Sequence, residues 1–189
     1  MTNKHASVAV VGGGSAAFEA AVAAKQSGAP SVIMLEKAPE PEFGGNARFS
    51  HTGFRFVYSG ADEIRQFLPD MDETSFRNLQ LPGYFPEHFT ADLMRVTRGR
   101  INKDLAQVLV NECNGAIHWM RELGIQWEPA GSVEIDGKRY FEPGIVIHPT
   151  GGVGGGVSQL NQWRAIASRM GIEIYFDSRV RELLGNDRH

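Results

Sequence analysis

Three glycines near the start of the chain have the spacing of a site for the phosphates of a dinucleotide. Gly12, Gly13 and Gly14 follow the apolar residues 8–11, and Ala17 stands three positions after Gly14. In this G-x-G-x-x-G/A pattern the first glycine turns the chain tightly and the second admits a pyrophosphate close to the backbone, while a small third residue lets a helix pack against a strand. The N–H groups at the start of that helix then face the phosphates.

An acidic residue, Glu36, stands where such a site needs an acceptor for the hydroxyl groups of an adenosine ribose. It follows the apolar residues 32–35 and lies 22 positions after Gly14. A carboxylate here fits NAD or FAD and disfavours NADP, because its charge repels a 2′-phosphate. The alternative is a glycine-rich turn in an ordinary α/β domain with a surface glutamate. We favour the dinucleotide site, because the sequence has the expected order of a strand, the glycines, a helix of small residues, a second strand and an acidic residue.

The elements that must position these residues are a strand, a helix and a second strand. The β-branched run at 8–11 is typical of a parallel strand buried on both faces. The alanine-rich stretch after it favours a helix, which Gly28 ends as a left-handed cap before the second strand at 31–35. The sequence therefore predicts an α/β fold with a parallel sheet.

The remaining chain alternates helical and strand patterns. A short helix follows Ser59, residues 70–88 have the composition of a loop, Asn102 caps a long helix, and Asp136-Gly137 indicates a hairpin. The buried stripe of the long helix should consist of its apolar residues at helical spacing, Leu105, Val108, Leu109, Cys113, Ala116, Ile117 and Met120. We expect strands at 125–128, 145–147, 172–176 and 179–184. A further helix should carry the apolar residues Leu160, Trp163, Ile166, Ala167 and Met170.

Length, charge and cysteine content limit the classes of protein to consider. The chain has 189 residues, a formal net charge of −3 and a pI near 6.1, which gives no reason to expect nucleic acid or an anionic membrane as a partner. Its one cysteine, Cys113, excludes an internal disulfide and suits a reducing compartment. There is no membrane-length apolar run and no room for a signal peptide before the first strand. We expect a cytoplasmic protein without membrane insertion.

A second glycine-rich stretch, residues 43–54, follows a proline-broken loop after Glu36. Gly44 and Gly45 permit close backbone approach to a ligand, and Asn46 and the small polar residues after it can present N–H and hydroxyl groups. One interpretation is a surface turn. The other follows from position, because the loop after the second strand of such a unit returns over the carboxyl edge of the sheet, where ligands bind.

Together these stretches resemble the FAD-dependent succinate dehydrogenase/fumarate reductase flavoprotein family. The resemblance rests on residues 10–17, 35–37 and 44–48, and it continues through 89–100, 148–152 and the closing helix and strand. Within the family it is nearest to tricarballylate dehydrogenase-like proteins. It implies a Rossmann-like, glutathione-reductase-type FAD-binding domain with a helical and hairpin excursion, in a truncated fold. The expected divisions are a βαβ segment at 1–58, the excursion at 59–150 and a return to the FAD-binding domain at 151–189.

The resemblance also implies which residues meet FAD. The pyrophosphate would lie on the glycine turn, the ribose on Glu36 with Lys37 close by, and the flavin ring near Ser50-His51-Thr52. Because that tripeptide is out of register with the family's covalent flavin histidine, we expect FAD to be bound non-covalently. The implied set is Gly12, Gly14, Ser15, Ala16, Glu36, Lys37, Gly45, Asn46, Ala47, Ser50, His51, Thr52, Gly53 and Val180, the last at the adenine.

The resemblance further implies an oxidoreductase that moves a hydride between the flavin and a carbon next to a carboxylate. Tricarballylate is the specific candidate, and succinate/fumarate-type or ketosteroid-type chemistry is the alternative. No catalytic residue is assigned, because the family's substrate-binding arginines and histidines lie in a capping domain and C-terminal part outside this chain. We expect the chain alone to be inactive and to self-associate through its exposed half-sheet.

Rival interpretations are a non-catalytic nucleotide-binding module and an NAD(P)-binding domain, and Gly44-Gly45-Asn46 favours FAD over the latter. Arg95, Arg98, Arg100 and Lys103 form a basic cluster that we interpret as a solvated face, with attraction of a polycarboxylate or of the cofactor phosphates as the alternative. A second phosphate site is conceivable where the glycine-rich residues 151–156 open a helix, but the resemblance implies that this loop lies against the flavin side of the cofactor. His148 is assigned no role, and we expect no metal site.

Overall fold

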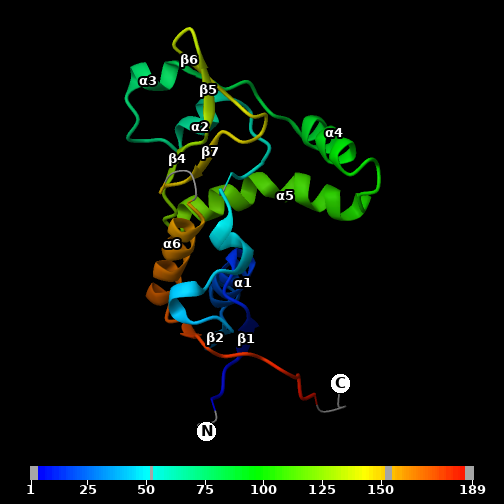
Figure 1. Ribbon diagram of the computed structural model, residues 1–189, viewed down its shortest axis with the longest axis vertical. Coiled ribbons are helices and arrows are strands. Elements are labelled where there is room, and N and C mark those ends of the chain that lie inside the picture. The colour runs from blue at the N-terminus through cyan, green and yellow to red at the C-terminus, as the bar shows by residue number, and fades with distance from the viewer. Residues whose placement is uncertain (1–3, 52, 152–154, 186–189) are drawn as a thin grey trace. The chain divides into compact units, whose positions relative to one another are not determined.

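The computed structural model describes residues 4–51, 53–151 and 155–185, and the chain divides into two compact units (Figure 1). Unit 1 consists of Met1–His51 and Gly154–His189, and unit 2 of Thr52–Val153. Unit 2 is therefore an insertion in the sequence of unit 1.

Unit 1 is built on a three-stranded parallel sheet. Its strands have the order β1-β2-β8, with Val8 paired to Val32 and Ile33 to Glu173. The elements of unit 1 are β1 (Val8–Val11), α1 (Ser15–Gln26), β2 (Val32–Leu35), the short 3₁₀ helices η1 (Glu40–Glu42) and η2 (Gly45–Phe49), α6 (Gly156–Arg169) and β8 (Glu173–Tyr175). The predicted strand–helix–strand start and its parallel sheet are confirmed, and Gly28 has the left-handed φ of +93° expected of a cap.

The core of unit 1 forms where α1, β2 and α6 meet. Phe18, Met34 and Trp163 have no exposed surface. The ring of Phe43 lies edge-on to Phe18 and to Phe176, with centroids 6.1 and 5.6 Å away. These aromatic contacts fix the segment after β2 against α1 and against the end of β8.

Strand β1 is not buried on both faces, contrary to the expectation from its apolar sequence. Ala9 and Val11 are exposed, and 59% of the surface of Val11 is accessible. The strand order gives the reason. Among the described strands β1 lies at the edge of the sheet, with only β2 as a neighbour.

Unit 2 combines the helices α2 to α5 with two small sheets, one ordered β3-β6-β5 and the other β4-β7. Its elements are α2 (Ala61–Arg65), α3 (Glu73–Arg77), β3 (Leu79–Gln80), α4 (Pro86–Val96), α5 (Lys103–Glu122), β4 (Trp127–Pro129), β5 (Ser132–Ile135), β6 (Lys138–Phe141) and β7 (Ile147–Pro149). The Asp136-Gly137 turn joins β5 to β6 as predicted, with both residues at positive φ. Asn102 caps α5 as predicted, because its side chain accepts from the N–H of Leu105 at 3.0 Å.

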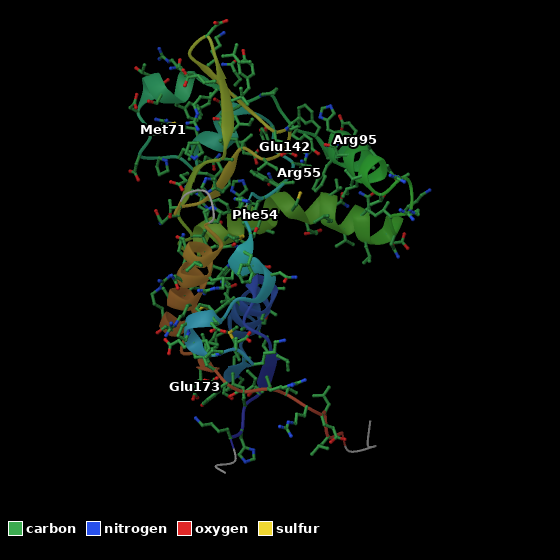
Figure 2. All side chains as sticks on the ribbon, in the orientation of Figure 1. Phe54, Arg55, Met71, Arg95, Glu142 and Glu173 are labelled. Carbon is green, nitrogen blue, oxygen red and sulfur yellow. The ribbon has the colours of Figure 1, made fainter. Side chains whose placement is uncertain are left out.

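A polar cluster around Arg55 ties distant segments of unit 2 together (Figure 2). The guanidinium donates to Asp92 at 3.2 Å and to Glu142, and the hydroxyl of Tyr84 donates to the same Asp92 at 2.9 Å. Arg55 therefore links the start of unit 2 to α4 and to the segment between β6 and β7.

The buried side of α5 is partly different from the predicted one. Cys113, Ile117 and Met120 are buried as expected, and the location of Cys113 supports a packing role. The other buried residues are Ala106 and Val110, whereas Leu105, Val108, Leu109 and Ala116 are exposed. The helix carries two apolar sides, and the core of unit 2 covers the one whose spacing is 4-3-4-3.

Three further expectations need correction. Residues 70–88 contain α3 and β3, because Asp72 caps α3 by accepting from the N–H of Ser75. Residues 179–184 form no strand. Strands β4 and β7 begin two residues later than predicted, at Trp127 and Ile147.

Within the described ranges, no helix combines the length and the apolar character that a bilayer span requires.

Candidate dinucleotide site

The turn between β1 and α1 has a backbone that requires glycine. Gly12 has a φ of +120°, and its N–H donates to the carbonyl of Leu35 at 2.9 Å, which ties the turn to the end of β2. A Cβ on Gly13 would lie 2.7 Å from Oε2 of Glu36, and a Cβ on Gly14 would lie 3.3 Å from the carbonyl oxygen of Gly44. The glycine turn therefore lies against Glu36 on one side and Gly44 on the other.

The first turn of α1 is suited to an anion. Gly14 is the N-cap residue, no side chain caps the helix, and the first turn contains no acidic residue. Ser15 is half-buried and Ala16 is exposed. The positive end of the helix dipole therefore meets no competing carboxylate of its own turn, which is the condition for holding phosphates.

Glu36 is buried and held at the end of β2. Only 6% of its surface is exposed, and its Oε1 accepts from the N–H of Ala38 at 2.7 Å. Its own N–H donates to the carbonyl of Tyr175 at 2.9 Å. One carboxylate oxygen is thus fixed by the backbone while the other lies beside Gly13. Lys37, the next residue, is exposed.

The second glycine-rich stretch turns back toward the first. Gly44 and Gly45 have φ values of +116° and +54°, so both use the left-handed region. Asn46 is exposed and Ala47 is half-buried at the start of η2, and the N–H of Ser50 closes η2 by donating to Ala47 at 3.1 Å. This stretch, Gly44–Ser50, is called the η2 segment below.

The start of α6 packs on the same η2 segment. The N–H of Gly156 donates to the carbonyl of Ser50 at 3.2 Å, and a Cβ on Gly156 would lie 2.0 Å from the carbonyl oxygen of Ala47. A Cβ on Gly44 would lie 2.2 Å from Cδ1 of Leu160. The beginnings of α1 and α6 therefore both contact the η2 segment, α1 at Gly44 and α6 at Ala47–Ser50.

Other predicted residues are placed as follows. His51 is exposed, and Val180 is half-buried two residues after Ser178, whose N–H donates to the carbonyl of Glu36 at 2.8 Å. Gly53 lies in unit 2, where a Cβ would come within 2.9 Å of Ile145. Thr52 and Gly152 lie outside the described residues.

The prediction from sequence missed one residue of this region. Gly13 lies against Glu36, and its signal was a glycine at the variable position of the pattern.

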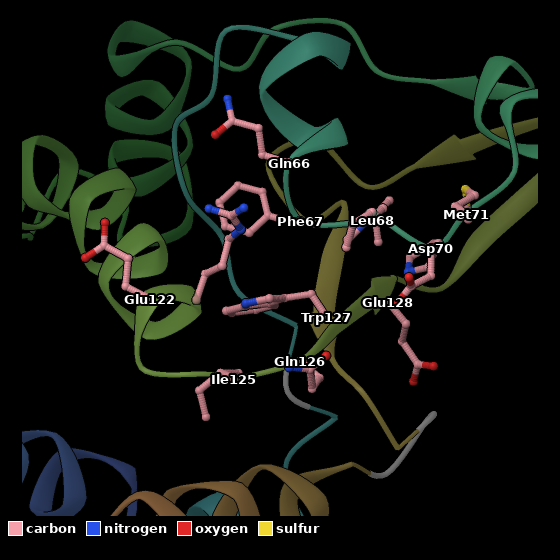
Figure 3. Close-up of a pocket in the computed structure, with 13 residues that line it drawn as sticks. Gln66, Phe67, Leu68, Asp70, Met71, Glu122, Ile125, Gln126, Trp127 and Glu128 are labelled. Atoms are coloured by element: carbon pink, nitrogen blue, oxygen red, sulfur yellow. The ribbon is translucent and has the colours of Figure 1, made fainter.

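Unit 2 contains a separate cavity of about 480 Å³ (Figure 3). Phe67, Met71 and Trp127 give it apolar walls, and Arg121 and Glu128 give it charged ones. Beside it, His148 is buried, with Nδ1 2.8 Å from the carbonyl of Pro149 and 3.7 Å from the carboxylate of Glu128. Because a carbonyl only accepts, Nδ1 carries the proton of that bond. No group of three His, Cys, Asp or Glu residues that could hold a metal ion occurs in the part of the chain that the structure describes.

Comparison with known proteins adds an independent line of evidence. The sequence pattern of the family described as "FAD binding domain" matches residues 7–187. Two curated relatives from Shewanella frigidimarina, "Probable fumarate reductase Ifc3" and "Fumarate reductase (cytochrome)", are 29% and 26% identical to this chain over 185 residues. These 185 residues are 96% of this chain but only 27% and 28% of the relatives, so the chain spans little more than a quarter of their length.

Solved structures show the same fold. The open conformation of a flavocytochrome c3 fumarate reductase matches with a TM-score of 0.67 and 29% identity, over 97% of this chain and 28% of that one. A 3-ketosteroid-Δ4-(5α)-dehydrogenase from Rhodococcus jostii matches with a TM-score of 0.66 at 19% identity, over 99% of this chain and 41% of that one, which is a likeness of fold alone.

Proposed function

This chain belongs to the FAD binding domain family, and on that premise we propose that it is the cofactor-binding part of a flavin-dependent oxidoreductase acting on a polycarboxylate. FAD is the cofactor. The observation that carries the proposal is the meeting of an uncapped helix start at Gly14, a glycine turn and the buried carboxylate of Glu36 at one end of a parallel sheet.

Each part of this region fits one part of the adenosine and pyrophosphate half of FAD. The first turn of α1 offers N–H groups and a positive dipole end to the phosphates. Glu36, beside Gly13, offers a carboxylate oxygen to a ribose hydroxyl. Gly44 and Gly45 allow the η2 segment to pass close to the middle of the cofactor, because no Cβ intervenes.

When bound, FAD supplies a flavin ring that accepts or donates a hydride. The residues of this chain bind and orient that cofactor. We propose that the substrate-binding residues belong to a capping domain of the whole protein, and we assign no catalytic residue in this chain.

For the whole protein we propose hydride transfer that interconverts C–C and C=C bonds of a small polycarboxylate, with tricarballylate as the candidate. Fumarate or succinate is the second candidate, supported by the names of the relatives. The single cysteine supports a cytoplasmic location as part of the proposal.

The experiment is a binding measurement on the purified chain. FAD is titrated into it while flavin absorbance and fluorescence are recorded, first for the wild type and then for Glu36→Ala. A carboxylate hydrogen bond contributes about 1.5–3 kcal/mol, so we expect the affinity to fall roughly 10- to 100-fold. Glu42→Ala, which removes an exposed glutamate of η1, is the matched control and should leave the affinity unchanged. Absence of flavin binding by the wild type would refute the proposal.

A further inference from the structure

Strand β5 forms an open edge of the three-stranded sheet of unit 2. Among the described strands its only neighbour is β6, and all four of its residues, Ser132–Ile135, are exposed. Val133, Ile135 and Tyr140 give one face of the β5–β6 hairpin an apolar surface, with 64%, 54% and 42% of their surface accessible. Proline, lysine or a bulge normally protects such an edge, and β5 has none of them. The edge is therefore open to another strand.

The backbone of β5 shows which of its residues are directed to that open side. The N–H of Arg139 in β6 donates to the carbonyl of Asn78 at 2.9 Å, just before β3 and away from β5. Arg139 and its partner Glu134 are therefore a non-hydrogen-bonded pair of the β5–β6 ladder. Because hydrogen-bonding direction alternates along a strand, Glu134 and Ser132 direct their N–H and C=O groups outward. These two residues stand symmetrically on either side of Val133.

The side chains along this edge are complementary in charge. Arg139 is paired with Glu134 across the ladder, but its guanidinium donates to the hydroxyl of Ser132 at 2.9 Å and to the carbonyl of Ala130 at 3.4 Å. Glu134 has no ion-pair partner among the described residues. The hydroxyl of Ser132, which accepts from Arg139, still has its own proton to donate. A carboxylate opposite Ser132 on the open side would therefore meet both a hydroxyl donor and a guanidinium.

We propose that β5 pairs with the β5 of a second copy of this chain, antiparallel and centred on Val133. In this register Ser132 of each copy lies opposite Glu134 of the other, so their outward N–H and C=O groups form reciprocal hydrogen bonds. The carboxylate of Glu134 then reaches Ser132 and Arg139 of the other copy, and the two Val133 side chains meet on the apolar face. The register centred on Glu134 is disfavoured, because it places like charges directly opposite each other. The two hairpins thus join into one continuous sheet.

The first test is the oligomeric state of the purified chain. An edge of four residues buries less surface than the about 1,000 Å² of a stable interface, so the dimer is weak. Sedimentation velocity should show a monomer at about 5 µM and a growing fraction of dimer at about 500 µM. Glu134→Lys places an ammonium against Arg139 and should remain monomeric at both concentrations. Glu122→Lys makes the same change of charge at the exposed end of α5 and should dimerise as the wild type does.

The second test is a cross-link that depends on the register. A non-hydrogen-bonded pair has Cα atoms about 4.5 Å apart, within the range that a disulfide bridges, so Val133→Cys should form a covalent dimer with oxidised glutathione. The wild type should not, because its single cysteine is buried. Ile135→Cys is the matched control on the same face. The two copies of Ile135 would lie roughly 13 Å apart along the strands, so this variant should not cross-link.

The two tests have outcomes that decide the proposal. A dimer lost in Glu134→Lys and cross-linked by Val133→Cys alone supports it, provided that the variants keep the circular dichroism spectrum expected of exposed substitutions. A wild type that stays monomeric at the higher concentration would overturn it. So would a dimer that survives Glu134→Lys, which would place the contact elsewhere, for example at the edge strand β1, or an equal cross-link in Ile135→Cys.

Discussion

Replacing Gly156 by alanine should destabilise the fold, because the clash of the added Cβ outweighs the higher helix propensity of alanine. Gly156 begins α6, and an added Cβ would lie 2.0 Å from the carbonyl oxygen of Ala47, with the carbonyl oxygen and carbon of Arg48 at 2.8 and 2.9 Å. All three are backbone atoms, so the clash can be relieved only by moving α6 or η2.

The expected magnitude follows from two opposing effects. Overpacking a tight site costs about 1–3 kcal/mol, and this contact belongs at the upper end because it is so short. Alanine is preferred over glycine in a helix by about 1 kcal/mol. The net loss should be about 2 kcal/mol, or roughly 4–8 °C in melting temperature for a chain of this length.

Gly115→Ala is the matched control. Gly115 lies within α5, and no atom lies within 4 Å of the position of an added Cβ. The same substitution should therefore stabilise the protein by about 0.5–1 kcal/mol. Urea denaturation followed by circular dichroism measures both changes, and hydrogen exchange should show faster exchange in α6 for Gly156→Ala. If Gly156→Ala were as stable as Gly115→Ala, the close packing of α6 on η2 would be refuted.

Three further predictions concern a carboxylate, a phenol and a glycine. Burial alone would raise the pKa of Glu63, but hydrogen bonds from Ser59, Asn114 and His118 outweigh this effect and lower the pKa. These hydrogen bonds therefore stabilise the fold above pH 4.5, and their contribution is lost as the pH falls through the lowered pKa. Glu63→Gln should flatten the acid decline of the urea midpoint, and an unchanged decline would contradict this. Burial raises the pKa of Tyr58 to about 12, so stability should fall as the pH rises from 10 toward 12, and Tyr58→Phe should remove the last phenol to ionise in a titration at 295 nm. Gly44→Ala combines a φ of +116° with a contact to Leu160 at 2.2 Å, so its melting temperature should fall, and an unchanged value would refute the packing.

Much of unit 1 could be predicted because its signals are local. The glycine turn, the alanine-rich α1, the Gly28 cap and the acid after β2 each follow from a few neighbouring residues, and so do the Asn102 cap and the Asp136-Gly137 hairpin of unit 2.

Which residues of the other elements are buried depends on the segments that pack against them, and these are distant in the sequence. The apolar sequence of β1 is that of an interior strand, but only the strand order reveals an edge. On α5, Leu109 and Val110 are equally apolar neighbours, and only the packing of unit 2 decides that Val110 is buried and Leu109 exposed.

The insertion of unit 2 within unit 1 sets the order in which these two units become complete on the ribosome. Unit 2 is continuous in sequence and is finished once Val153 has been synthesised. Unit 1 must wait, because β2 at Ile33 pairs with β8 at Glu173 and α6 comes just before it. At about 5–20 residues per second, the interval between these strands lasts on the order of ten seconds. The glycine turn between β1 and α1 is thus synthesised early, but the described sheet beside it is completed only after the inserted unit has had time to fold.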